Sequence, residues 1–300
     1  MGRLTALVLG AGAGGGFPQW NCNCPVCALA WAGDARVSPR SQAGIAVSAD
    51  GENWLLCNAS PDLRTQILKS AALQPRRGLR HSPIKAVLLT GGEIDQVAGL
   101  LTLRERQDVA LYATPATLAT IADNPMFAAL HPGRVKRHAL SVGETISPLP
   151  GLSVEIFTVP GKMPLYLEGE NPEIGESAVN VGVELAAGGA RLLYIPGAAG
   201  VTPAMRERMR RADVILFDGT LFADDEMIAL RVGEKTGMRM GHMPIDGPDG
   251  SLAALSDLPA RRIFIHINNT NPILIDGSPA RKGVEAAGFD VAYDGMEIAL

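Results

Sequence analysis

The chain has 300 residues, of which 47% are hydrophobic and 19% charged; this composition argues against disorder and allows one large domain or two ordinary ones. A net charge of −4 without a basic run argues against nucleic acid as a partner. No apolar segment reaches the roughly 20 residues that cross a bilayer, and the N-terminal apolar run lacks a polar cleavage region. We therefore expect a cytoplasmic protein.

A glycine-rich segment follows the first predicted strand, residues 4–9. Gly10, Gly12 and Gly15 match the G-x-G-x-x-G spacing of dinucleotide-binding loops. Such a loop needs a helix to begin within it, facing the pyrophosphate, and the polar sequence after Pro18 does not start one. We therefore favour a glycine loop at which the backbone passes close to a ligand or another segment.

Three of the four cysteines crowd together as Cys22-x-Cys24-x-x-Cys27. In a reducing compartment this spacing indicates a metal and not disulfides. Thiolates suit tetrahedral zinc with four ligands, so a fourth ligand must come from elsewhere. The alternative is a group of free thiols. Cys57 ends an apolar run and fits a small buried side chain better than a ligand.

Turn and cap residues divide the chain up to residue 150. Strands are predicted at 44–48 and 53–57, on either side of an Asp-Gly turn. Helices are predicted to open at Ser60 and at Thr114, each followed by proline. Residues 121–150 are rich in turn residues.

Two carboxylates follow the apolar run at residues 87–89. This run predicts a buried strand that ends in glycines, and Glu93 and Asp95 stand before a helical pattern. Acids in such a place lie at the carboxyl end of a sheet, where α/β proteins bind ligands. The alternative is that Asp95 only caps the helix.

The second half of the chain repeats the alternation of strands and helices without a distinct linker, so we predict one α/β domain built from two similar halves. Strands are predicted at 153–158, 180–185, 190–195, 214–217 and 262–267, with two short strands within 289–300.

An acid and two histidines mark the ends of these strands. Asp218 follows one strand, His266 ends another, and His242 lies in the loop between them. Alone, Asp218 suits a turn and His266 suits a satisfied core histidine. Together with Asp95 they predict a site for a hard or borderline metal.

The pattern resembles the metallo-β-lactamase superfamily, and nearly the full length resembles the PqqB family of pyrroloquinoline quinone (PQQ) biosynthesis. The stretches that carry the resemblance are GAGGGFPQWNCNCPVC (12–27), NASPDLR (58–64), GLLTLRE (99–105), FDGT (217–220), GHMPI (241–245) and HINNTNPIL (266–274). The resemblance implies an αββα sandwich of two facing mixed sheets flanked by helices. It implies one domain over residues 1–300, with a cysteine metal-binding loop at 10–27.

The chain departs from the superfamily at its metal motif. Residues 91–96, GGEIDQ, occupy the place of H-x-H-x-D-H, so only Asp95 remains and Gln96 replaces a ligand histidine. A further family histidine would fall at Gly161-Lys162. A two-metal hydrolytic centre would lack most of its imidazoles, so a hydrolase is the weaker expectation.

The remaining residues could hold one metal. The resemblance makes Asp95, His266, His242, Asp218 and Glu93 the catalytic candidates, with Asp95 and His266 as ligands of Fe²⁺. Such a set resembles the two-histidine, one-carboxylate arrangement of non-haem iron.

For function, the resemblance implies iron- and O₂-dependent hydroxylation of the tyrosine ring in a Glu–Tyr precursor. The alternative is a non-catalytic factor that carries PQQ or its precursor toward the periplasm. The implied partners are a small peptide-derived precursor and other proteins of the pathway, and a homodimer is left open. For structural Zn²⁺ on the three cysteines, the resemblance places the fourth ligand at Asn269, with water or a backbone group as alternatives.

Overall fold

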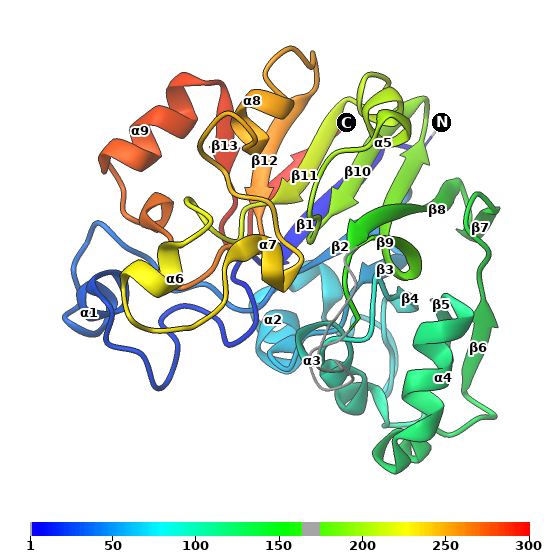
Figure 1. Ribbon diagram of the computed structural model, residues 1–300. Coiled ribbons are helices and arrows are strands. Elements are labelled where there is room, and N and C mark those ends of the chain that lie inside the picture. The colour runs from blue at the N-terminus through cyan, green and yellow to red at the C-terminus, as the bar shows by residue number, and fades with distance from the viewer. Residues whose placement is uncertain (1, 164–174) are drawn as a thin grey trace.

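The computed structural model describes residues 2–163 and 175–300. Within these ranges two seven-stranded sheets face each other, with helices on their outer sides (Figure 1). Both sheets mix parallel and antiparallel pairs. The predicted fold class, an αββα sandwich of two mixed sheets, is confirmed.

Each half of the chain builds one sheet, except that the last strand returns to the first sheet. In spatial order the first sheet contains β14 (Glu297–Ala299), β1 (Thr5–Gly10), β2 (Gly44–Ser48), β3 (Trp54–Cys57), β4 (Ile84–Leu88), β5 (Val109–Ala113) and β6 (Val135–Ala139). The second contains β13 (Phe289–Val291), β12 (Arg261–Ile265), β11 (Val214–Asp218), β10 (Ala190–Ile195), β9 (Gly175–Ala187), β8 (Leu152–Gly161) and β7 (Thr145–Leu149).

Short helices connect these strands. The α-helices of the described ranges are α1 (Pro25–Trp31), α2 (Leu63–Lys69), α3 (Ile94–Val97), α4 (Pro115–Asp123), α5 (Pro203–Met209), α6 (Glu226–Ala229), α7 (Gly237–Met240), α8 (Ser251–Ala254) and α9 (Pro279–Ala286). The 3-10 helices are η1 (Ala71–Leu73), η2 (Ala98–Leu103), η3 (Pro125–Ala129) and η5 (Pro272–Leu274). No helix among the described residues is both long and apolar enough to cross a membrane.

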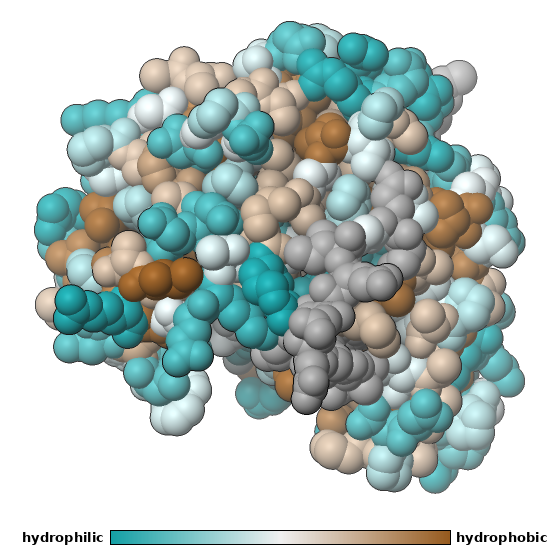
Figure 2. All heavy atoms as spheres, in the orientation of Figure 1, coloured by the Kyte–Doolittle hydropathy of each residue, from teal (hydrophilic) through white to brown (hydrophobic). Residues whose placement is uncertain are grey.

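Three apolar layers hold the sandwich together. The middle layer joins the facing sheets, for example through Ile45 of β2 and Leu216 of β11. Outer layers join α2 and α4 to the first sheet, and α5 and α9 to the second. On the face shown in Figure 2, hydrophobic residues form small separate groups among hydrophilic ones. Burial of alternating apolar side chains from both sheets is therefore what fixes the strand ends relative to one another.

Parallel pairing sets the location of the acids and histidines. β10, β11 and β12 run parallel, so the residues that follow them emerge at one edge of the second sheet. Asp218 ends β11 and His266 directly follows β12. In the first sheet, β3 and β4 are also parallel, and β4 leads to Asp95.

Most predicted elements are present, but the start of one helix was wrong and two strands were not predicted. Helix α2 begins at Leu63, later than predicted, and Ser60 does not cap it; its N-cap, Asp62, makes no side-chain cap and instead accepts hydrogen bonds from Gln42. Residues 121–150, where no strand was predicted, contain β6 and β7. β6 buries only its first residue, so its sequence shows no apolar alternation.

The end of the chain contributes one strand to each sheet. The two short strands predicted within 289–300 are present, and they belong to different sheets. β13 extends the second sheet and β14 pairs with β1 in the first.

Gly99 allows the helical turn after Asp95 to pack against the loop that follows β3. A Cβ built on Gly99 would lie 2.0 Å from the Ser60 carbonyl oxygen and 2.7 Å from that of Ala59. Because both atoms belong to backbone, Gly99→Ala should destabilise the fold by about 1–3 kcal/mol. Denaturant unfolding checks this, with Gly283→Ala as control, because a Cβ there meets nothing within 4 Å.

Candidate metal centres and pocket

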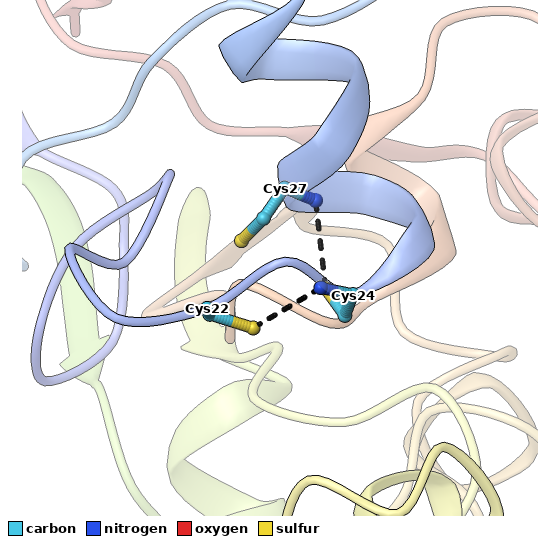
Figure 3. Close-up of side chains that lie close together, drawn as sticks. All are labelled: Cys22, Cys24 and Cys27. Carbon is cyan, nitrogen blue, oxygen red and sulfur yellow. Dashed lines mark hydrogen bonds between the residues drawn. The ribbon is translucent and has the colours of Figure 1, made fainter.

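The three cysteines of the N-terminal loop converge. Their sulfur atoms all lie within 4.8 Å of one another. Figure 3 shows Cys22 in the loop before α1 and Cys27 in the first turn of that helix. Cys24 is the N-cap, and its Sγ accepts a hydrogen bond from the Cys27 backbone N–H at 3.4 Å. Three sulfurs at this separation suit the tetrahedral coordination of Zn²⁺.

Asn269 lies against this thiol cluster, although 242 positions separate it from Cys27. Its side-chain nitrogen is 3.1 Å from the Sγ of Cys22 and 3.3 Å from that of Cys27. Its backbone carbonyl accepts from the thiols of Cys24 and Cys27, each at 3.7 Å. The side-chain amide and the carbonyl oxygen of Asn269 are thus both within reach of an ion held by the sulfurs.

Burial makes the thiols hard to ionise without a metal. It raises the pKa of Cys24 to about 12 and also raises the pKa of Cys27. Cys57, which we predicted to be a buried side chain, is fully buried in β3 and lies outside the cluster. A divalent cation would compensate the charge that the buried cysteines acquire as thiolates.

A second cluster lies at the strand ends. His242 Nδ1 is 2.6 Å from Asp218 Oδ2, and His266 Nε2 is 3.0 Å from Asp95 Oδ2. The two imidazole rings stack, with centroids 5.3 Å apart. Ligand atoms of Asp218, His242 and His266 lie within 4.8 Å of one another. The structure therefore brings four of the five predicted catalytic residues into one network.

Thr220 is the centre of this network, and the sequence did not single it out. Its hydroxyl is 2.6 Å from Asp218 Oδ1, 3.1 Å from His242 Nδ1 and 2.9 Å from His266 Nδ1. The signal was present in the FDGT stretch, but a threonine after Asp-Gly is ordinary in a turn. Thr220 fixes the orientation of both imidazoles.

Charges within the network oppose the effect of burial. Burial raises the pKa of Asp95, but the hydrogen bond and charge of His266 outweigh it, so the pKa is lowered. Burial lowers the pKa of His266, but Asp95 and Asp218 raise it overall. The pKa of Asp218 is lowered by His242 in spite of burial. The carboxylates are thus held in the ionised form that binds cations.

His266 has an unusual backbone conformation. Its φ is 58°, in the left-handed region that non-glycine residues rarely adopt. Such a conformation costs on the order of 1–3 kcal/mol and persists only where surrounding contacts enforce it. Strain of this kind is concentrated at functional sites.

The remaining predicted residue, Glu93, is the N-cap of α3 at the rim of the site. Gln96 completes a capping box, because its Oε1 accepts from the Glu93 backbone N–H at 3.1 Å. The alternative that Asp95 caps this helix was wrong, since Glu93 holds that place and Asp95 pairs with His266. Gln96 thus has a local structural role where the superfamily motif has a histidine.

A pocket of about 400 Å³ opens over the second cluster. Asp95, His242 and His266 line it together with Gly14 of the glycine loop. Further lining residues that the sequence did not indicate are Gln19, Lys162, Asn180, Thr220, Lys235 and Asn268. No helix starts within the glycines, so the dinucleotide alternative fails and the loop is a wall of this pocket.

Comparisons with known proteins agree with this geometry. Residues 53–267 match the model of the beta-lactamase superfamily domain. Coenzyme PQQ synthesis protein B from Methylobacterium nodulans is 56% identical over 99% of this chain and 100% of its own length. The protein of that name from Rhizobium meliloti is 53% identical, over 99% of this chain and 98% of its own.

Solved structures with the same fold include a protein of the same name and a more distant enzyme. The crystal structure of Zn²⁺-bound PqqB from Methylobacterium extorquens has a TM-score of 0.97 at 56% identity, and the match covers 99% of this chain and 100% of that one. A diphosphatase of the PhnP family shares the fold, with a TM-score of 0.69 at 22% identity, over 99% and 97% of the two chains.

The sandwich, with its clusters at one edge, is that of a metallo-β-lactamase-superfamily protein. Within that superfamily the chain belongs to the family of coenzyme PQQ synthesis protein B.

Proposed function

We propose that this protein acts in PQQ biosynthesis as an iron- and O₂-dependent hydroxylase of the tyrosine ring in a Glu–Tyr precursor. Family membership supports the pathway. The observation that carries the reaction is the set of His242, His266 and Asp218, whose ligand atoms lie within 4.8 Å of one another beside an open pocket. Two imidazoles and one carboxylate are the set that non-haem iron uses while leaving positions free.

The proposed reaction exchanges one ring C–H bond for C–OH. One oxygen atom of O₂ enters the ring and the other leaves as water, which requires two electrons from an external reductant. Bound iron would supply the activation of O₂. His242, His266 and Asp218 would hold it, with Asp95 as a further carboxylate or as the partner that orients His266 through Nε2.

Two lysines give the pocket an affinity for acidic ligands. Lys162 and Lys235 both line it, and a lysine side chain ends in an ammonium group that donates hydrogen bonds. A Glu–Tyr unit bears carboxylates that such cations pair with. The pocket volume of about 400 Å³ is in the range of small-molecule sites.

For the thiol cluster we propose structural Zn²⁺ held by Cys22, Cys24 and Cys27, with an oxygen of Asn269 as the fourth ligand. The zinc-bound relative supports the metal, and the sulfur separations support the ligands. Three reduced thiols at metal spacing also favour a cytoplasmic setting for the protein.

The reaction is tested by loading the protein with Fe²⁺ under anaerobic conditions, then adding Glu–Tyr, a reductant and air. We expect mass spectrometry to detect a product heavier by one oxygen atom. Zinc-loaded protein without iron is the control and should return the dipeptide unchanged. Hydroxylation of equal extent in that control would contradict the role of iron.

Gln96→His tests how far the departure from the superfamily motif weakens iron binding. Gln96 offers only a neutral oxygen or amide, so a histidine there should raise iron affinity about tenfold, equivalent to about 1.4 kcal/mol. The new side chain also removes the hydrogen bond to the Glu93 N–H, so melting temperature is recorded alongside iron titration. Unchanged or weaker iron binding in a folded variant would show that position 96 does not face the metal.

One observation favours a second function, a non-catalytic carrier of PQQ or its precursor. Gln96 is engaged in a capping box where a ligand histidine would stand, while Lys162 and Lys235 are among the residues that line the pocket. Calorimetric binding of PQQ to iron-free protein, together with no turnover by the iron-loaded form, would favour the carrier.

A further inference from the structure

We propose that the thiol cluster is a positioning device for His266: once it holds zinc, it fixes the segment 266–269 and thereby the imidazole in the pocket. Asn269 is the positioning residue that connects the two sites. The proposal rests on the zinc site proposed above, and it is independent of the reaction in the pocket.

The first connection runs along the chain. Only two residues separate His266 from Asn269. The side-chain nitrogen of Asn269 approaches two of the three sulfurs, at 3.1 and 3.3 Å, and its carbonyl oxygen approaches two at 3.7 Å. A change in the thiol cluster therefore reaches His266 through a very short, buried stretch of backbone.

The second connection runs through the glycine loop. Ile267 N–H donates to the Ala11 carbonyl at 2.8 Å, and Ala13 N–H donates to the Ile267 carbonyl at 2.9 Å. This loop leads directly into Cys22, and a Cβ built on Gly14 would lie 3.8 Å from the Asp95 carboxylate carbon. The glycine loop that precedes the cysteines is thus hydrogen-bonded to Ile267, the residue after His266, and passes close to Asp95.

Contacts on both sides of His266 support its left-handed backbone conformation. Its carbonyl accepts from the Thr220 hydroxyl at 3.0 Å, and the next residue but one, Asn268, donates through its N–H to the Thr220 carbonyl at 3.0 Å. On the other side, Asn269 contacts the three sulfurs through its side-chain amide and its backbone carbonyl, so a zinc ion bound by these sulfurs would hold Asn269 in place. Without zinc, Asn269 would not be held in this way, and the segment that follows His266 would be less constrained.

Hydrogen exchange tests this without any metal in the pocket. We compare zinc-loaded wild type, Cys24→Ser and Asn269→Ala, following the amides of Ala13, Ile267 and Asn268. In both variants these amides should exchange at least about tenfold faster, as expected for local opening, while those of β4 stay protected. Val284→Ala, a buried change in α9, is the control for general destabilisation and should leave the three amides unchanged.

Equal protection of these amides in wild type and Asn269→Ala would overturn the proposal. So would equally fast exchange in Val284→Ala, because the effect would then be global. Loss of iron binding or of turnover does not enter this comparison, so a failure of the proposed reaction is distinguishable from a failure of the coupling.

A second measurement uses Co²⁺ as a spectroscopic probe of the pocket, with zinc retained at the thiols. Asn269→Ala should weaken Co²⁺ binding at His266 about 10–100-fold, the effect of disturbing a residue that orients a ligand. Asn269→Asp, which offers zinc a carboxylate oxygen, should restore the affinity. Equal Co²⁺ affinity in wild type and Asn269→Ala would contradict the role of Asn269.

Discussion

Replacing His266 by alanine is expected to abolish iron binding in the pocket and hydroxylation of Glu–Tyr. His266 contributes one of the two imidazoles of the cluster, and its removal also leaves Asp95 without its hydrogen-bond partner at 3.0 Å. Asp95 is almost fully buried, and a buried carboxylate that loses its partner is left with an uncompensated charge, so thermal stability is recorded as well. Metal analysis and the dipeptide assay measure both effects.

His131→Ala is the matched control for this variant. It removes a histidine that is exposed in a loop before β6 and is remote in sequence from every pocket residue. Iron content and turnover should equal those of wild type. If His266→Ala retained iron binding or turnover, the cluster would have no catalytic role in this protein. The carrier function would then be favoured over the hydroxylase.

Replacing Cys24 by serine is expected to lower zinc content and thermal stability together, because metal binding is coupled to folding. A ligand present at a thousand times its dissociation constant stabilises the folded state by about 4 kcal/mol. Each kcal/mol shifts the melting temperature by about 2–4 °C in chains of 150–250 residues. We therefore expect a decrease of about 10 °C, which calorimetry and metal analysis can measure.

Cys57→Ser makes the same chemical change outside the cluster. Cys57 is fully buried in β3 and has no part in the group of three thiols. This variant should keep its zinc and lose only the stability that a buried hydroxyl costs. Full zinc occupancy and unchanged melting in Cys24→Ser would refute the zinc site.

The sequence predicted the elements that alternate in polarity or carry a turn signal. The hairpin of β2 and β3, the strands β10 to β12 and the helix after Thr114 all have such signals, and Thr114 caps α4 as expected. β6 has none, because it is largely exposed. Periodicity detects only strands that bury one face.

The site was predicted in part for a similar reason. Residues with distinctive chemistry at strand ends, such as Asp218 and His266, are visible in the sequence. Thr220 and the pocket lysines are not, because a threonine or a lysine is ordinary in a loop and its role depends on which loops meet. The contact of Asn269 with the cysteines spans nearly the whole chain. Only the resemblance to a family indicated it.

The origin of the oxygen atom tests the central claim most directly. Iron-loaded protein is mixed with Glu–Tyr and an external reductant under isotopically heavy O₂ in ordinary water, and the product is analysed by mass spectrometry. The account predicts one heavy oxygen atom on the tyrosine ring in wild type and His131→Ala, and none in His266→Ala. An unchanged dipeptide with wild-type protein that has bound its iron, or a product whose oxygen comes from water, would contradict it.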